Sequence, residues 1–259
     1  MTAPQSFTLA SRLRAGETVF TGWCGLGLPL VAEALAREGF SAVTLDQQHG
    51  AYDLASSAQA IAAIRHAGAA PVVRVPLGEF ATAARLLDLG AEGVIAPMIN
   101  TVEDARHFVS ATKYPPAGER SWGPTRAVML TGLDQPTYFR EANAQTLTLA
   151  MIETRQALEN VGAIAAVVGI DALFVGPYDL AIALSNGKSQ DPQSPEVEKA
   201  LDSIVAAAAR AGKIPGLYCA NAERALATAK RGFRFLAVGS DLGMLRAGGA
   251  EQMKKLKMG

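Results

Sequence analysis

Short apolar runs alternate with longer amphipathic runs from one end of the chain to the other. The short runs are apolar at consecutive positions, which is typical of parallel strands buried on both faces. We predict eight strands on this pattern. They cover Val19–Cys24, Ala42–Asp46, Val72–Val75, Gly93–Pro97, Leu147–Glu153, Ala172–Gly176, Ile214–Cys219 and Phe235–Gly239.

The longer runs carry apolar residues at helical spacing, and glycines such as Gly39 and Gly90 follow them as C-terminal caps. The predicted helices cover Pro29–Glu38, Leu54–His66, Phe80–Leu89, Val102–Ala111, Ala157–Val168, Glu196–Ala211 and Ala222–Lys230. The segment Lys113–Arg140 is rich in proline and glycine and shows no clear periodicity. We therefore expect it to be irregular and to serve a function or an interaction.

Eight strands that alternate with helices over 259 residues fit either a (β/α)8 TIM barrel or a doubly wound open sheet. No change in composition divides the chain into halves. No Gly-x-Gly-x-x-Gly motif follows the first strand, because Gly22, Gly25 and Gly27 have a different spacing. The sequence thus favours an α/β protein with one TIM-barrel domain over residues 1–259.

Composition narrows the class of protein. Lys+Arg 24 balances Asp+Glu 24, so the chain offers no basic surface for nucleic acid or an anionic membrane. The apolar runs fall short of the roughly 18 residues of a membrane helix, and residues 1–11 do not resemble a signal peptide. Cys24 and Cys219 form no CxxC pattern, which argues against a disulfide framework or a Cys-ligated zinc site. We expect a cytoplasmic protein.

In a TIM barrel the active site lies at the carboxyl ends of the strands. Asp46 and His49 follow the second predicted strand, Arg74 lies at the end of the third, and Glu153 ends the fifth. Structural roles stay open for several of them. Asp46 and His49 could cap the next helix, and Arg74 could pair with a loop carboxylate. Ser240 and Asp241, after the last strand, are expected to cap the final helix.

The sixth predicted strand leads into Gly176, Pro177, Tyr178 and Asp179. Asp179 alone would suggest a helix N-cap, but it lies one strand from Glu153. Two carboxylates plus waters suit Mg²⁺ or Mn²⁺ better than a closed zinc site. They would neutralise the cation, and the backbone N–H groups of Tyr178 and Asp179 could then bind a substrate carboxylate.

Lysine is absent from the predicted strand ends. The one lysine next to a strand, Lys213, precedes the seventh and so lies at the opposite face. Schiff-base chemistry by a barrel lysine is therefore disfavoured, and metal-assisted chemistry remains.

Eight segments along nearly the whole chain resemble the HpcH/HpaI family of class II, metal-dependent pyruvate aldolases. They are RAGETVFTGWCGL, LDQQHG, VVRVP, RLLDLGAEGVIAPMI, KYPPAGERSWGPTRA, MIETRQALENV, DALFVGPYDLAIALS and FLAVGSDLGML. The resemblance implies a TIM barrel that holds Mg²⁺, Mn²⁺ or Co²⁺ between Glu153 and Asp179, with a 2-oxo acid chelating the metal.

The resemblance also implies roles for single residues. Arg74 would contact the keto or enolate oxygen, and Asp88 would reach a histidine of a neighbouring subunit. His49, which shares its motif with Asp46, is linked to proton transfer, and whether His49 or a metal-bound water is the base stays open. The implied assembly is a homo-oligomer, usually a hexamer built from dimers that exchange their C-terminal helices.

Two positions depart from the family pattern. Gln48 replaces a common glutamate beside His49, and Met151 replaces a common glutamine two residues before Glu153. Both leave the choice between pyruvate and hydroxypyruvate open. The expected reaction is reversible aldol cleavage and addition between a small-molecule 2-oxo acid and an aldehyde. A citramalyl- or malyl-CoA lyase and a non-catalytic oxo-acid-binding barrel are the alternatives.

Overall fold

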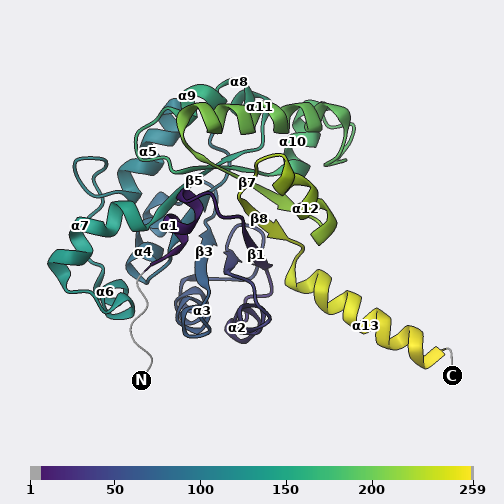
Figure 1. Ribbon diagram of the computed structural model, residues 1–259, viewed down its shortest axis with the longest axis horizontal. Helices are drawn as coiled ribbons and strands as arrows, with labels where there is room; N and C mark the ends of the chain where they lie inside the picture. The colour runs from purple at the N-terminus through teal and green to yellow at the C-terminus, as the bar shows by residue number, and fades with distance from the viewer. Residues whose placement is uncertain (1–6, 258–259) are drawn as a thin grey trace.

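Eight parallel strands close into a barrel in the order β1 to β8, with helices around it (Figure 1). The structure is a computed structural model of the chain and describes residues 7–257. The predicted TIM barrel is confirmed. The strands are β1 (Val19–Cys24), β2 (Ala42–Asp46), β3 (Ala70–Arg74), β4 (Gly93–Ala96), β5 (Leu147–Ile152), β6 (Ala172–Val175), β7 (Ile214–Cys219) and β8 (Phe235–Val238).

The helices follow the expected alternation over most of the chain. They are α1 (Leu9–Arg14), α2 (Pro29–Arg37), α3 (Leu54–His66), α4 (Phe80–Asp88), α5 (Val102–Thr112), α6 (Thr125–Thr131), α7 (Gln135–Gln145), α8 (Arg155–Glu159), α9 (Val161–Ala165), α10 (Pro177–Leu184), α11 (Pro195–Ala211), α12 (Ala222–Lys230) and α13 (Asp241–Lys257). No helix within residues 7–257 has the length and hydropathy needed to cross a membrane.

The expectation that Lys113–Arg140 is irregular was wrong in part. The segment contains α6 and the start of α7. Local signals explain both helices, because Gly132 ends α6 at a φ of 68°, and the side chain of Asp134 accepts a hydrogen bond from the backbone N–H of Thr137 at 2.7 Å. The predicted helix Ala157–Val168 is instead two short helices, α8 and α9, which meet at Asn160.

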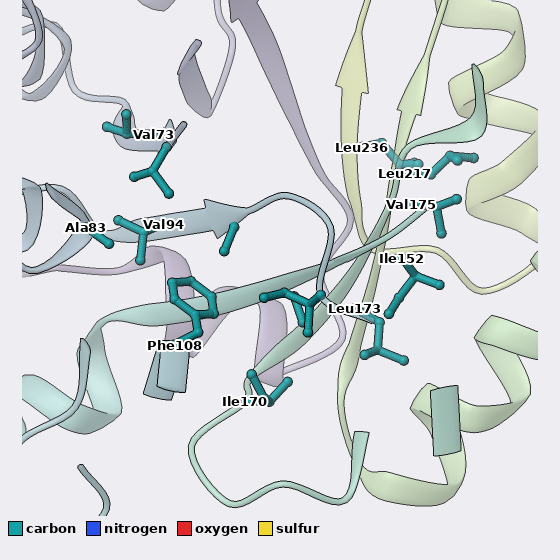
Figure 2. Packing of buried hydrophobic residues seen from close by; sticks show 14 of the residues in the cluster. Val73, Ala83, Val94, Phe108, Ile152, Ile170, Leu173, Val175, Leu217 and Leu236 are labelled. Atoms are coloured by element: carbon teal, nitrogen blue, oxygen red, sulfur yellow. The ribbon is translucent and has the colours of Figure 1, made fainter. Parts of the chain in front are cut away.

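Apolar side chains fill both sides of the strands. Figure 2 shows part of the outer layer, in which Val73, Val94 and Leu217 pack between the barrel and the surrounding helices. Inside the barrel, a second cluster includes residues from the first positions of several strands, and Leu9, Ala10 and Leu13 of α1 pack against it. Helix α1 therefore closes the amino-terminal end of the barrel, and the opposite end remains for ligands.

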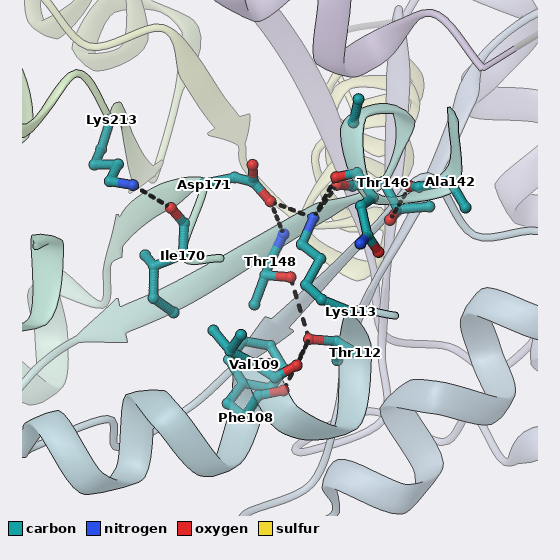
Figure 3. A network of polar contacts seen from close by, with 12 residues as sticks. Phe108, Val109, Thr112, Lys113, Ala142, Thr146, Thr148, Ile170, Asp171 and Lys213 are labelled. Atoms are coloured by element: carbon teal, nitrogen blue, oxygen red, sulfur yellow. Dashed lines mark hydrogen bonds and ion pairs between the residues drawn. The ribbon is translucent and has the colours of Figure 1, made fainter. Parts of the chain in front are cut away.

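A buried polar network fixes the long connection between β4 and β5 (Figure 3). The ammonium group of Lys113 donates to the backbone oxygens of Asn143 at 2.9 Å and Thr146 at 2.6 Å, and it pairs with Asp171 at 2.7 Å. Asp171 also accepts the backbone N–H of Thr148. Lys113 therefore has a structural role at the amino-terminal ends of β5 and β6.

The last helix, α13, extends away from the barrel (Figure 1). Its apolar side chains Leu245, Met253 and Leu256 are exposed. The space between α2 and α12, where a TIM barrel ordinarily places its last helix, is a groove of about 320 Å³ lined by apolar residues that include Phe20, Phe40 and Leu226. Among the described residues, nothing covers the groove or these exposed side chains of α13, although the first residue of the helix contacts the loop after β1.

Candidate active site

A cavity of about 400 Å³ opens at the carboxyl ends of the strands. Its volume falls in the range of roughly 300–1,000 Å³ that small-molecule sites occupy. Most of the residues predicted from the sequence line it together. These are Asp46, His49, Arg74, Gly176, Pro177, Tyr178 and Asp179.

Asp46 and Arg74 form a buried, two-pronged ion pair. They are neighbours in register at the ends of β2 and β3, and Arg74 donates from Nε at 3.0 Å and from Nη2 at 2.6 Å. The indole N–H of Trp23 also donates to Asp46, at 3.2 Å. Burial alone would raise the pKa of Asp46, but the guanidinium of Arg74 holds that pKa below its ordinary value. The pair therefore places a fixed positive group in the wall of the cavity.

The same carboxylate shapes the loop that carries His49. Asp46 Oδ1 accepts the backbone N–H groups of Gln48 at 3.0 Å and of His49 at 3.2 Å. The capping alternative for these residues is excluded, because Asp53 caps α3 through a 2.7 Å hydrogen bond from the backbone of Ser56. His49 is exposed at the cavity, whereas Gln48 does not line it, and the side-chain oxygen of Gln48 has no hydrogen-bond partner within residues 7–257.

Glu153 is buried just beyond the end of β5, directly against Gly176. A Cβ at position 176 would lie 2.5 Å from Glu153 Oε2 and 2.7 Å from Met151 Cε. Any residue other than glycine would therefore displace these two side chains. The other oxygen, Oε1, accepts the backbone N–H of Met98 at 2.8 Å. Met98 has a φ of 55°, a strained value for a residue with a side chain, and such strain concentrates at functional sites.

Asp179 lies in the first turn of α10, on the side of the cavity next to Gly176. The N-cap of this helix is Gly176, so Asp179 is not the capping residue. The N–H groups of a first helical turn have no partner within the helix, which leaves those of Tyr178 and Asp179 suited to binding an anion.

Several cavity residues were missed by the sequence analysis. Trp23 and Tyr218 lie near the ends of β1 and β7, and the rule that strand ends carry the site would have found them, but both resemble ordinary core residues.

Ser240 caps α13 as expected, with its hydroxyl accepting the N–H of Gly243 at 3.2 Å. Asp241 does something else: it accepts the N–H groups of Gly25 and Leu26 and so holds the loop after β1.

Asp88 lies outside this cavity. It ends α4, at the amino-terminal side of the barrel, and pairs with Arg120 at 2.6 Å. Within its own chain it cannot contact His49. The expected contact with a neighbouring subunit therefore stays a prediction.

A sequence profile of the HpcH/HpaI aldolase/citrate lyase family matches residues 21–247. The chain belongs to this family. It is 40% identical over 232 residues to a hydroxypyruvate/pyruvate aldolase of Rhizorhabdus wittichii, covering 90% of this chain and 91% of the relative. A 5-keto-4-deoxy-D-glucarate aldolase of Klebsiella pneumoniae is 36% identical over 247 residues, covering 94% and 93%.

Solved structures agree with this assignment. The crystal structure of an HpcH/HpaI aldolase/citrate lyase family protein from Burkholderia cenocepacia superposes with a TM-score of 0.88 at 32% identity, covering 97% of this chain and all of that one. The present HpcH/HpaI family member is a carbon–carbon lyase of the aldolase type.

The site of this aldolase fits a divalent cation. Glu153 and Asp179 are close enough that the charge of Asp179 raises the pKa of Glu153. No cluster of three or more His, Cys, Asp or Glu side chains that could enclose a metal occurs within residues 7–257. Two carboxylates with free positions suit a hard cation that binds substrate oxygens, rather than a closed structural site.

One carboxyl group of the site has an unusual pKa. Burial raises the pKa of Glu153 from its ordinary 4.5 to about 7, and Asp179 adds to the rise. The Met98 N–H and Arg74 oppose it. Because the folded protein holds the proton more tightly than the unfolded chain, the stabilisation from this group is present below pH 4.5 and is lost as pH rises through about 7.

We expect this loss to be measurable in protein treated with EDTA. Between pH 5 and pH 8 the free energy of unfolding of the wild type should fall by about 2–3 kcal/mol relative to that of Glu153→Gln, whose amide does not titrate. Urea unfolding of both proteins at the two pH values gives this difference. An unchanged difference would show that Glu153 is ionised throughout.

Proposed function

We propose that this protein catalyses reversible, divalent-metal-dependent aldol cleavage and addition between a 2-oxo acid, pyruvate or hydroxypyruvate, and an aldehyde. The observation that carries the proposal is that Asp179 and the Arg74–Asp46 pair line one cavity, while the buried carboxyl group of Glu153, behind this lining, is close enough to feel the charges of Asp179 and Arg74. The name of the Rhizorhabdus wittichii relative supports both 2-oxo acids.

Glu153 and Asp179 are the residues that would hold Mg²⁺, Mn²⁺ or Co²⁺. When bound there, the cation supplies Lewis-acid stabilisation of negative charge on substrate oxygens. The backbone N–H groups of Tyr178 and Asp179 bind the substrate carboxylate, and Gly176 and Pro177 shape that part of the site.

In the cleavage direction a 4-hydroxy-2-oxo acid loses the proton of its C4 hydroxyl, the C3–C4 bond breaks, and an aldehyde leaves. Arg74 donates to the oxygen that gains charge as the enolate forms. Asp46 keeps the guanidinium in place and positions the loop of His49. His49 moves the proton to or from the reacting atoms, and protonation at C3 completes the 2-oxo acid.

Two reagents test this class of chemistry. EDTA should abolish turnover of pyruvate with an aldehyde, and added Mn²⁺ should restore it. Sodium borohydride with pyruvate should leave the protein mass unchanged, because no lysine among the described residues lines the cavity. The measurements are product formation and intact mass spectrometry. A borohydride-stable adduct would contradict the proposal, and turnover of acyl-CoA thioesters alone would favour a CoA-dependent lyase.

We also propose that copies of the chain assemble by exchanging α13, in dimers that build a hexamer. The helix exposes the apolar side chains of Leu245 and Leu256. The groove between α2 and α12 is lined mainly by apolar residues and could therefore bind this face of the helix. Burying both faces removes apolar surface from water, which stabilises the assembly by about 25 cal/mol per Å² of apolar surface buried.

A charge in the groove should weaken this assembly. Leu226→Glu is expected to lower the solution mass, because burying a carboxylate against α13 is unfavourable. Leu77→Glu, at an exposed leucine outside the groove, is the matched control. Light scattering after size-exclusion chromatography measures the mass. A Leu226→Glu protein with the wild-type mass would contradict helix exchange.

Other parts of the assignment remain predictions from the sequence. They are the contact between Asp88 and a neighbouring subunit's histidine, the cytoplasmic location, and the absence of nucleic-acid and membrane partners. The position of Asp88 on the outer side of the barrel is compatible with a contact between copies.

A further inference from the structure

Three aromatic side chains form one side of the active-site cavity, and we call Trp23, Tyr178 and Tyr218 the aromatic wall. The ring of Tyr218 meets that of Trp23 edge-on, with centroids 5.4 Å apart and planes at 86°. Tyr178 extends the wall, and the centroid of its ring lies 6.2 Å from that of Tyr218. Behind it, Trp23 stacks on Phe174 at 5.9 Å. Because each ring packs against another, the wall is a fixed apolar surface.

The wall carries no charge. Burial raises the pKa of Tyr218, so its hydroxyl stays neutral in the physiological range. Leu26 and Leu242 continue the apolar lining.

One cation lies against this surface, because the guanidinium of Arg74 sits over the ring of Trp23, 4.9 Å from the ring centroid. Among residues 7–257, Arg74 and His49 are the basic side chains that line the cavity, and Arg74 already donates twice to Asp46. The carboxylate of Asp241 lies in the lining as well. A second carboxylate on a ligand would thus meet rings, a guanidinium whose charge Asp46 already compensates, and the like charge of Asp241, which is unfavourable in a partly desolvated site.

We propose that the aldehyde binds against the aromatic wall and that the wall selects aldehydes with an uncharged apolar or aromatic substituent over aldehydes that end in a carboxylate. This inference rests on the proposed aldolase function. The 2-oxo acid occupies the space between Asp179 and Arg74.

The test compares three unconjugated aliphatic aldehydes of similar carbonyl reactivity, with pyruvate and Mn²⁺. Butanal and succinic semialdehyde have the same chain length and differ in the terminal methyl or carboxylate, and 3-phenylpropanal adds a ring. We expect kcat/KM to decrease from 3-phenylpropanal to butanal to succinic semialdehyde, by about tenfold or more between the extremes.

Variants at one position separate the ring from its hydroxyl. Tyr218→Leu should lower the preference for 3-phenylpropanal over butanal by about 3- to 10-fold, because the stacking surface is lost. Tyr218→Phe is the matched control and should keep the preference. Equal loss in both variants would overturn the role of the ring.

A separate measurement tells failure of this inference from failure of the proposed function. Exchange of the C3 hydrogens of pyruvate in D₂O, followed by NMR, reports enolate formation without any aldehyde. Exchange together with a preference for succinic semialdehyde, or with no preference, overturns the selection by the wall alone. Absence of both exchange and product overturns the aldolase function and this inference with it.

Discussion

Replacing Glu153 by glutamine is expected to abolish binding of Mn²⁺ and to lower kcat/KM for aldol turnover by about 10³-fold or more. Glutamine keeps the volume of the side chain and can still accept the Met98 N–H, but it lacks the negative charge that a divalent cation requires. Asp179→Asn should have a similar effect. Isothermal titration calorimetry with Mn²⁺ and an activity assay measure the two quantities.

The control is Glu119→Gln, which removes an exposed carboxylate far along the chain from the cavity residues. It should bind Mn²⁺ as the wild type does. Near-normal turnover in both Glu153→Gln and Asp179→Asn would contradict the assignment of the metal ligands.

Loss of Arg74 should reduce kcat/KM by about 10²–10³-fold, the usual effect of removing one donor to a developing oxyanion. In Arg74→Ala, the carboxylate of Asp46 is also left buried without its cation, so the protein should lose about 3–5 kcal/mol of stability. Arg74→Lys separates the two effects. It restores a charge for Asp46 but cannot provide the two-pronged geometry, so stability should recover more than activity.

Measuring kcat/KM against pH distinguishes this role from that of His49. His49→Ala should lower the rate by about 10²–10⁴-fold and change the pH profile, because a proton-transfer group is lost. Arg74→Lys should keep the shape of the profile. An Arg74→Lys enzyme with wild-type kcat/KM would rule out the need for the guanidinium.

The strands and most of the site could be predicted because their signals are local. Each strand is a consecutive apolar run, and the position of a polar residue at the end of such a run already decides which face of the barrel it occupies. Asp46, Arg74 and Asp179 were found in this way, and the structure brings them to one cavity. The register of β2 against β3 then accounts for the pairing of Asp46 with Arg74.

The residues and elements that the sequence analysis missed depend on contacts that the local sequence does not encode. Trp23 and Tyr218 follow the same apolar pattern as core residues, and only the closed barrel shows that their rings face the cavity. Asp241 looks like a helix cap, yet its carboxylate reaches the loop after β1, more than 200 positions away in the chain. The short helix α6 lacks a periodic pattern long enough to recognise.

The proposed exchange of α13 would make the activity of this enzyme depend on its own concentration. The first residue of the helix, Asp241, holds the N–H groups of Gly25 and Leu26, and both residues lie in the cavity lining. If the remainder of the helix is anchored on another copy of the chain, separating the copies removes the anchor from a group that shapes the mouth of the site. The specific activity would then fall on dilution, as the assembly dissociates, and would rise again with protein concentration.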